Sequence, residues 1–189
     1  MSFTEEFATI DMIAESQLPT RAVDVFALSI IKMERQMRKL FTYLIFQSDD
    51  FDDHHVAGLR GVLSDNKRVY FDGFERGIDA LYPLSVEQIV GAEYGGLRRI
   101  VSDALAVRNK IFHGQLTDHC LLREDLVELA TDVRRWCELL AGNAQLELGY
   151  DGFGRPSFRK GPLPLSGRYK VQVNCLDSYR DFLARYVQR

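Results

Sequence analysis

The chain has 189 residues, of which 46% are hydrophobic and 27% are charged, and its formal net charge is −3 at pH 7. These values fit one globular domain with a sizeable core, and they exclude a disordered, collagen-like or rod-like coiled-coil protein. No stretch approaches the roughly 18 apolar residues that a membrane-spanning helix needs. The N-terminal segment is acidic where a secretory signal would be basic and apolar, so we expect a cytoplasmic protein without a membrane partner.

The first half of the chain predicts two helices and a long connection. A capping-box spacing of serine and glutamate opens a short helix over residues 2–15, and a long amphipathic helix follows over residues 22–46. Residues 48–84 contain several glycines and an acidic stretch, which predicts an irregular connection. Within it, residues 55–63 and 72–81 have the composition of short helices.

Two further long helices are predicted after Pro83. The first covers residues 86–112, where Gly95 and Gly96 would kink it or allow close contact, and Gly114 is placed to end it. The second covers residues 121–141, with Gly142 just beyond its end.

Three long amphipathic helices predict an all-α fold, an up-down bundle over residues 1–147. The remaining residues, 148–189, form a basic extension packed on this bundle. Its Gly/Pro-rich arm, residues 149–167, precedes a short strand over residues 169–174 and a terminal helix that carries Tyr179, Phe182, Leu183 and Tyr186.

The stretch Arg108-Asn109-Lys110-Ile111-Phe112-His113-Gly114 ends a long predicted helix. On such a helix Asn109 and His113 share a face, whereas Arg108 and His113 lie roughly 140° apart around the axis. A helix C-terminus favours the imidazolium form of histidine, which keeps a proton available near neutral pH. On spacing alone, a surface arginine and a C-terminal capping histidine are the alternative.

The segment RNKIFH resembles the R-(four to six residues)-H motif of HEPN domains, in which asparagine often follows the arginine. The resemblance covers about residues 20–142, including an earlier helix that carries Glu34, Arg35 and Arg38. It implies a helical bundle that dimerises through the motif helices and, in many members, cleaves RNA without a metal or other cofactor. Arg108 and His113 would then be catalytic, and Asn109 would support them.

This resemblance predicts a homodimeric, metal-independent endoribonuclease of the toxin or defence type, with RNA as substrate and an antitoxin protein as a further partner. Imidazole would move the proton of the ribose 2′-OH or of the leaving oxygen, and guanidinium would stabilise charge at phosphorus. Gln115 stands where HepT-type toxins carry a tyrosine that a partner modifies, so neutralisation by adenylylation is not implied. A non-catalytic module that binds nucleotide, RNA or protein is the main alternative, and an unrelated helical interaction protein is the third.

Basic and aromatic residues alternate in the arm. Residues 150–189 carry eight Lys or Arg against three Asp, a net charge of +5, which leaves −8 for residues 1–149. This pattern predicts RNA contacts by Arg155, Arg159 and Lys160, with Lys110 beside the motif. An arm that wraps the bundle, anchored by its phenylalanines, is the alternative. No P-loop or dinucleotide fingerprint is present.

Residues that could bind a metal do not show the spacing of a known metal site. The segment DDFDDHH, residues 49–55, has ligand chemistry but no recognised ligand spacing, so we expect a solvated loop and no metal site. His119 is expected in a turn, with the cleft as its alternative place. Cys120, Cys137 and Cys175 have no CxxC spacing and are expected to be small core residues.

Overall fold

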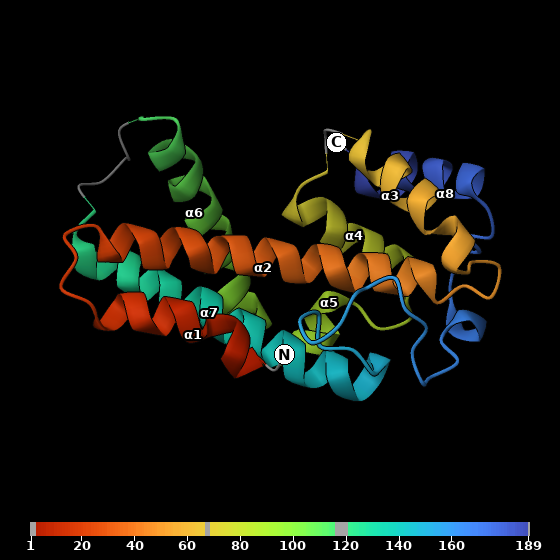
Figure 1. Ribbon diagram of the computed structural model, residues 1–189, viewed down its shortest axis with the longest axis horizontal. Coiled ribbons are helices and arrows are strands. Elements are labelled where there is room, and N and C mark those ends of the chain that lie inside the picture. The colour runs from red at the N-terminus through yellow and green to blue at the C-terminus, as the bar shows by residue number, and fades with distance from the viewer. Residues whose placement is uncertain (1–2, 67–68, 116–120, 189) are drawn as a thin grey trace.

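The computed structural model describes residues 3–66, 69–115 and 121–188, and this part of the chain is all-helical, without a strand (Figure 1). Its α-helices are α1 Phe3–Glu15, α2 Arg21–Phe46, α3 Val56–Ser64, α4 Phe71–Leu81, α5 Val86–Val90, α6 Tyr94–Phe112, α7 Arg123–Leu148 and α8 Leu176–Phe182. Short 3₁₀ turns lie at Asp53–His55 and Ser166–Arg168, and a π-helical turn, Leu183–Val187, continues α8. None of the helices described is long and apolar enough to cross a membrane.

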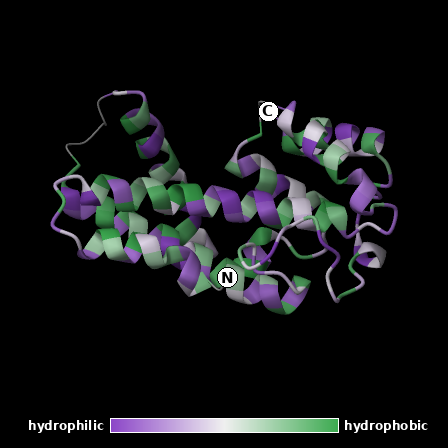
Figure 2. Cartoon of the chain, viewed as in Figure 1, coloured by the Kyte–Doolittle hydropathy of each residue, from purple (hydrophilic) through white to green (hydrophobic). Residues whose placement is uncertain are grey.

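The 26-residue helix α2 is the centre of an all-α bundle and runs across the molecule (Figure 1). It packs against α1, α4, α6 and α7. Its buried side carries Ile30, Met33, Met37, Leu40 and Phe41 at helical spacing, as an amphipathic helix requires. Figure 2 shows a hydrophilic stretch in the middle of α2, between α6 and the arm.

The boundaries predicted for α1 and α2 are confirmed, and the short helices named over residues 55–63 and 72–81 are confirmed as α3 and α4. The description of residues 48–84 as an irregular connection is wrong, because these two helices fill much of it. Its glycines allow close packing and do not break the helices. A Cβ atom on Gly77 would lie 2.8 Å from both the Phe41 ring and the Val187 side chain, and one on Gly73 would collide with the carbonyl oxygen of Val187. Glycine is therefore needed where the C-terminal turn crosses α4.

The single helix predicted over residues 86–112 is divided into α5 and α6. The break is at Gly91, whose φ of 86° is in the region that favours glycine. The predicted helix is interrupted at Gly91 and not at Gly95 and Gly96, which lie in the first turn of α6. A Cβ atom on either of these glycines would meet no atom of another described segment within 4 Å, so they do not provide a close helix contact. Gly114, with φ of 62°, follows the end of α6 as predicted.

Helix α7 continues through Gly142, where the sequence predicted its end, and stops at Gly149, whose φ is 70°. Ala144 and Leu148 extend the apolar stripe of α7 and are buried. Their burial offsets the cost of one helical glycine, which is about 1 kcal/mol.

The short strand predicted over residues 169–174 is wrong. Its backbone and side chains bond to helix ends, because no neighbouring strand is available in the described chain. The Lys170 amide donates to the Leu81 carbonyl at 2.9 Å, and the Tyr169 hydroxyl donates to the Leu44 carbonyl at 2.5 Å. The terminal helix follows as α8 and its π turn, which pack on α3 and α4.

Two of the three cysteines lie in the described chain. Cys137 is buried in the core as predicted, and burial raises the pKa of its thiol. Cys175 is exposed, so its predicted core position is wrong: its sulfur accepts from the Ser178 amide at the start of α8. Cys120 is outside the described residues.

Candidate functional site

The RNKIFH segment forms the last turn of α6. The helix stays regular to Phe112, and the His113 amide still donates to the Asn109 carbonyl at 3.1 Å. Asn109 and His113 are exposed, and Lys110 is half-buried. Arg108 and His113 therefore lie roughly 140° apart around the axis, and no hydrogen bond between them is found in the described part of the chain.

Arg108 instead reaches across to α2. Its Nη2 atom lies 2.5 Å from Oε1 of Glu34, and both side chains are half-buried. Burial raises the pKa of the Glu34 carboxyl, although the Arg108 guanidinium lowers it. Glu34 engages only part of the guanidinium, which has five N–H donors.

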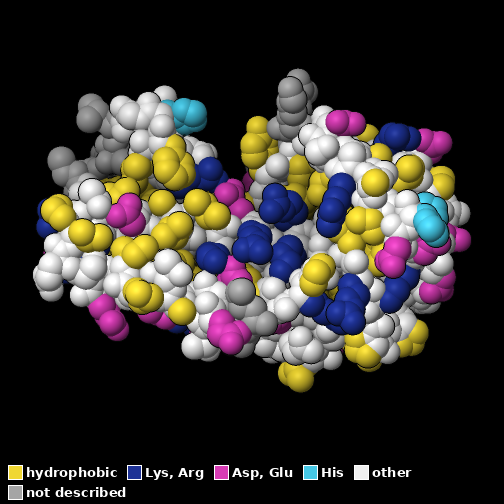
Figure 3. All heavy atoms as spheres, viewed as in Figure 1, with side chains coloured by type: hydrophobic (Ala, Val, Ile, Leu, Met, Phe, Trp, Pro, Cys, Tyr) yellow, Lys and Arg dark blue, Asp and Glu magenta, His cyan; other side chains and the backbone are white. Residues whose placement is uncertain are grey.

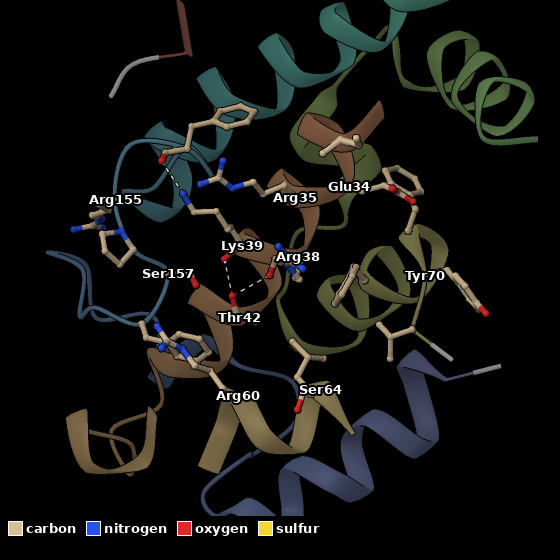
Figure 4. Close-up of a pocket in the computed structure, with 18 of the residues that line it drawn as sticks. Glu34, Arg35, Arg38, Lys39, Thr42, Arg60, Ser64, Tyr70, Arg155 and Ser157 are labelled. Atoms are coloured by element: carbon tan, nitrogen blue, oxygen red, sulfur yellow. Dashed lines mark hydrogen bonds between the residues drawn. The ribbon is translucent and has the colours of Figure 1, made fainter. Parts of the chain in front are cut away.

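Glu34 is also on the wall of a pocket of about 940 Å³ (Figure 4). The floor of this pocket is the hydrophilic middle of α2, and its walls are α3, the start of α4 and the arm. In the part of the chain that the structure describes, five cationic side chains line it: Arg35, Arg38, Lys39, Arg60 and Arg155. Figure 3 shows Lys and Arg side chains gathered over the middle of this face. We call this the basic pocket.

Aromatic rings hold two of these cations in place. The Arg60 guanidinium lies 5.2 Å from the centroid of the Phe158 ring, and that of Arg155 lies 5.3 Å and 5.4 Å from the rings of Tyr43 and Tyr150. Arg155 also donates to the Gly149 carbonyl at 2.9 Å. Such contacts restrict each guanidinium before any ligand binds.

The cations of α2 have different partners. Lys39 donates to the Phe153 carbonyl at 2.7 Å, and burial lowers its pKa. Arg35 pairs with Glu6 at 3.0 Å. Arg38 is exposed, and no carboxylate of the described chain forms an ion pair with it.

The four residues predicted to bind RNA take different positions. Arg155 lines the basic pocket. Lys160 donates to the carbonyls of Phe46 and Ser48 at 2.7 and 2.5 Å, so it caps the end of α2. Arg159 is exposed outside the pocket lining, and Lys110 is on α6.

The arm itself is anchored in the bundle. The Phe153 ring is buried and packs against the rings of Phe3 and Phe7, and the Phe158 ring packs against that of Phe46. These contacts show the wrapping arrangement named as the alternative for the arm, and Arg155 of the same arm lines the basic pocket.

Sequence reasoning missed the basic pocket. It noted Glu34, Arg35 and Arg38 on one helix but did not join them to Arg60, which it placed in an irregular connection. The sequence feature that could have indicated the pocket is the one-turn spacing of Arg35 and Arg38 on the hydrophilic face of this amphipathic helix.

The acidic segment over residues 49–55 forms local contacts. Oδ1 of Asp52 accepts from the His54 amide at 2.9 Å and lies 2.8 Å from Nδ1 of His55, and Asp49 accepts from the Ser166 hydroxyl. Within the described ranges, no three His, Cys, Asp or Glu side chains gather as metal ligands. His119 is outside the described residues.

Comparison with protein-family models, with curated proteins and with solved structures finds no match to this chain.

Proposed function

We propose that this chain is a metal-independent endoribonuclease of the HEPN type, in which Arg108 and His113 cleave RNA by attack of the 2′-OH. The observation that carries the proposal is the contact between Arg108 and Glu34. Because Glu34 is on the wall of the basic pocket, the arginine of the motif adjoins the most positive surface of this face. Such a surface draws a polyanion toward the site.

The chemistry needs a proton acceptor, a proton donor and a cation at phosphorus. His113 removes the 2′-OH proton as that oxygen attacks phosphorus, or gives a proton to the leaving 5′ oxygen. Arg108 stabilises the charge that grows on the phosphoryl oxygens. The products are a 2′,3′-cyclic phosphate and a 5′-hydroxyl, and no metal takes part in the step.

One chain supplies one such histidine, and its Arg108 points away from it. A two-fold dimer supplies the second copy of each residue. Three exposed apolar side chains are available for the interface of such a dimer: Phe112 at the end of α6, and Leu122 and Val127 at the start of α7. In this proposal the protein acts as a toxin or defence effector, which an antitoxin partner restrains.

A non-catalytic module that binds RNA or nucleotide is the second candidate. The observation that favours it is the same ion pair, because Glu34 neutralises the arginine that catalysis needs. A phosphate must displace Glu34 from Arg108 for the first proposal to hold.

The deciding experiment is incubation of the full chain with end-labelled RNA in the presence of EDTA. The ribonuclease proposal expects cleavage that leaves a 2′,3′-cyclic phosphate. Products with 3′-hydroxyl ends that need Mg²⁺ would refute the mechanism. RNA that is bound but never cut would leave the binding module as the function.

A further inference from the structure

The basic pocket holds more positive charge than an internal RNA phosphate requires. Among the described residues of its lining, five cationic side chains stand against the two carboxylates of Glu6 and Glu34, a formal charge of +3. Glu6 is shared between Lys32, which is outside this set, at 2.5 Å and Arg35, which belongs to it, at 3.0 Å, whereas Glu34 pairs with Arg108. An internal phosphodiester carries one negative charge, whereas a terminal phosphate carries about −1.5 to −2. The charge of the pocket therefore matches a terminal phosphate or a polyphosphate better.

The lining is divided into a cationic part and an apolar part. In Figure 4, Lys39, Arg60 and Arg155 lie on one side of the pocket and Tyr70 lies on the opposite side. Apolar side chains of three helices also line the pocket: Ile31 of α2, Leu63 of α3 and Phe74 of α4. Tyr70 is 59% exposed, so its ring has free surface on which a base can stack.

The cationic part is organised before a ligand arrives. Arg60 and Arg155 are held by aromatic rings, and Lys39 is held by the Phe153 carbonyl. Preorganised donors lose less entropy when an anion binds. A volume of about 940 Å³ also admits a ligand larger than a nucleotide base alone.

We propose that the basic pocket binds a nucleotide by its terminal phosphate groups, with the phosphates at Arg38, Lys39 and Arg60 and the base against Tyr70. The shared chemistry is a phosphorylated nucleoside, which is supplied by a free nucleoside triphosphate or by the 5′ end of an RNA. The site goes beyond RNA cleavage and does not depend on it, because it requires neither Arg108 nor His113.

The test is calorimetric titration of the full chain with matched probes. ATP is compared with adenosine and with inorganic phosphate, and a 5′-phosphorylated 2′-O-methyl oligonucleotide is compared with its 5′-hydroxyl form. These oligonucleotides lack the attacking 2′-OH, so binding is measured without cleavage. In at least one of the two series, the phosphorylated probe should bind tenfold or more tightly than its unphosphorylated partner, and that series identifies the source.

Variants assign this binding to the pocket. Arg38→Ala combined with Arg60→Ala should weaken binding of the phosphorylated probe at least tenfold, and Tyr70→Ala should weaken it where Tyr70→Phe does not. Arg99→Ala is the matched control, since Arg99 is exposed on α6 and donates to the Gly95 carbonyl. Thermal melting of each variant shows that the fold is intact.

Four results would overturn the proposal. The first is no preference for the phosphorylated probe in either series. The second is unchanged binding by the paired arginine variant. The third is that the 5′-phosphorylated and 5′-hydroxyl oligonucleotides bind equally well and that the paired arginine variant abolishes the binding of both. The pocket would then hold the internal RNA backbone and not a terminal phosphate. The fourth is inorganic phosphate binding as tightly as ATP, because the nucleoside would then contribute nothing. The outcome of the cleavage assays does not depend on these binding measurements. Failure of the ribonuclease proposal can therefore be distinguished from failure of the nucleotide-binding proposal.

Discussion

Nη2 of Arg108 lies 2.5 Å from Oε1 of Glu34, and this contact joins the last turn of α6 to the middle of α2. Because Glu34 also lines the basic pocket, one carboxylate separates the arginine of the RNKIFH segment from the cations of α2. A phosphate that approaches Arg108 therefore competes with Glu34 and is favoured by the neighbouring positive charge.

Changes to the proposed catalytic pair should remove activity without unfolding the chain. We expect His113→Ala to slow RNA cleavage in EDTA by about 10²–10⁴-fold, because a proton-transfer step is lost. Arg108→Ala should cost about 3–4 kcal/mol of transition-state stabilisation, by analogy with an oxyanion-hole donor. Initial cleavage rates and circular dichroism spectra give the two readouts.

The matched controls for these variants are His54→Ala and Arg99→Ala. His54 is exposed in the 3₁₀ turn, and Arg99 is on α6, nine residues before Arg108 and so on the opposite side of the helix. Both controls should cleave as the wild type does. Full activity of His113→Ala would move the active site elsewhere.

Glu34 should make the stability of the chain depend on pH. Burial raises its pKa above 4.5, so the folded state holds this proton at pH values where the unfolded state has released it. The contribution of Glu34 to stability is therefore full below pH 4.5 and is lost as the pH rises through the raised pKa.

We expect the free energy of unfolding of the wild type to fall, relative to that of Glu34→Gln, as the pH rises from about 4 to 7. Urea unfolding at several pH values measures this difference. If the free energies of unfolding of the wild type and of Glu34→Gln changed with pH in parallel, the Glu34 carboxyl would have the same pKa in the folded and unfolded states, and this prediction would be wrong.

The sequence predicted the parts of the fold that depend on periodicity. The long apolar stripes of α2 and α7 are local patterns, and so is the end of α6 at Gly114. It named α3 and α4 only as short helices within an irregular connection, because Gly73 and Gly77 have the same appearance in a sequence whether they break a helix or allow another segment to approach.

The candidate site shows the same limit. Arg108 and His113 were found because they stand close together in one motif. The basic pocket was not found, because Arg38, Arg60 and Arg155 come from two helices and the arm, and only the tertiary fold brings them together. No spacing rule connects residues that are so far apart in the chain.

Two glycine substitutions should change stability in opposite directions. A Cβ on Gly77 would lie 2.8 Å from the Phe41 ring and from Val187, so Gly77→Ala should destabilise the fold by about 1–3 kcal/mol through overpacking. Gly61 is inside α3 with open space around its Cα, so Gly61→Ala should stabilise it by about 0.5–1 kcal/mol. Midpoints of thermal or urea unfolding give both values, and equal shifts of one sign would contradict the packing described for α4.

Two neighbouring cations of the arm should have different roles. Lys160→Ala should lower the free energy of unfolding by about 1 kcal/mol, because the carbonyls at the end of α2 lose a charged donor. Arg159→Ala should leave the free energy of unfolding unchanged. It should reduce the slope of log affinity for RNA against log salt concentration by about 1, which corresponds to one lost phosphate contact. Urea unfolding and RNA titrations at several salt concentrations separate the two effects. If Lys160→Ala changed only RNA binding, its capping role would be wrong.

Complementation between inactive variants should reveal whether the active site is shared across a dimer. Arg108 and His113 are roughly 140° apart on α6, so we expect Arg108 of one protomer to act with His113 of its partner. A heterodimer of Arg108→Ala and His113→Ala then contains one complete site, because each chain supplies the residue that the other lacks. Random exchange makes half of the dimers mixed, and each has one of two sites intact, so mixing should restore about a quarter of the wild-type rate.

The interface itself can be removed as a control for this experiment. Phe112→Asp combined with Val127→Asp places charges on two exposed apolar positions, one at the end of α6 and one near the start of α7, and it should give monomers in sedimentation and abolish complementation. Leu146→Asp is the matched change, because Leu146 is 79% exposed near the other end of α7. A wild-type chain that is monomeric at micromolar concentration and still cleaves RNA would contradict the shared site. A dimer whose inactive variants never complement would place both residues of each site in one chain, and α6 would then have to unwind near Gly114 to bring them together.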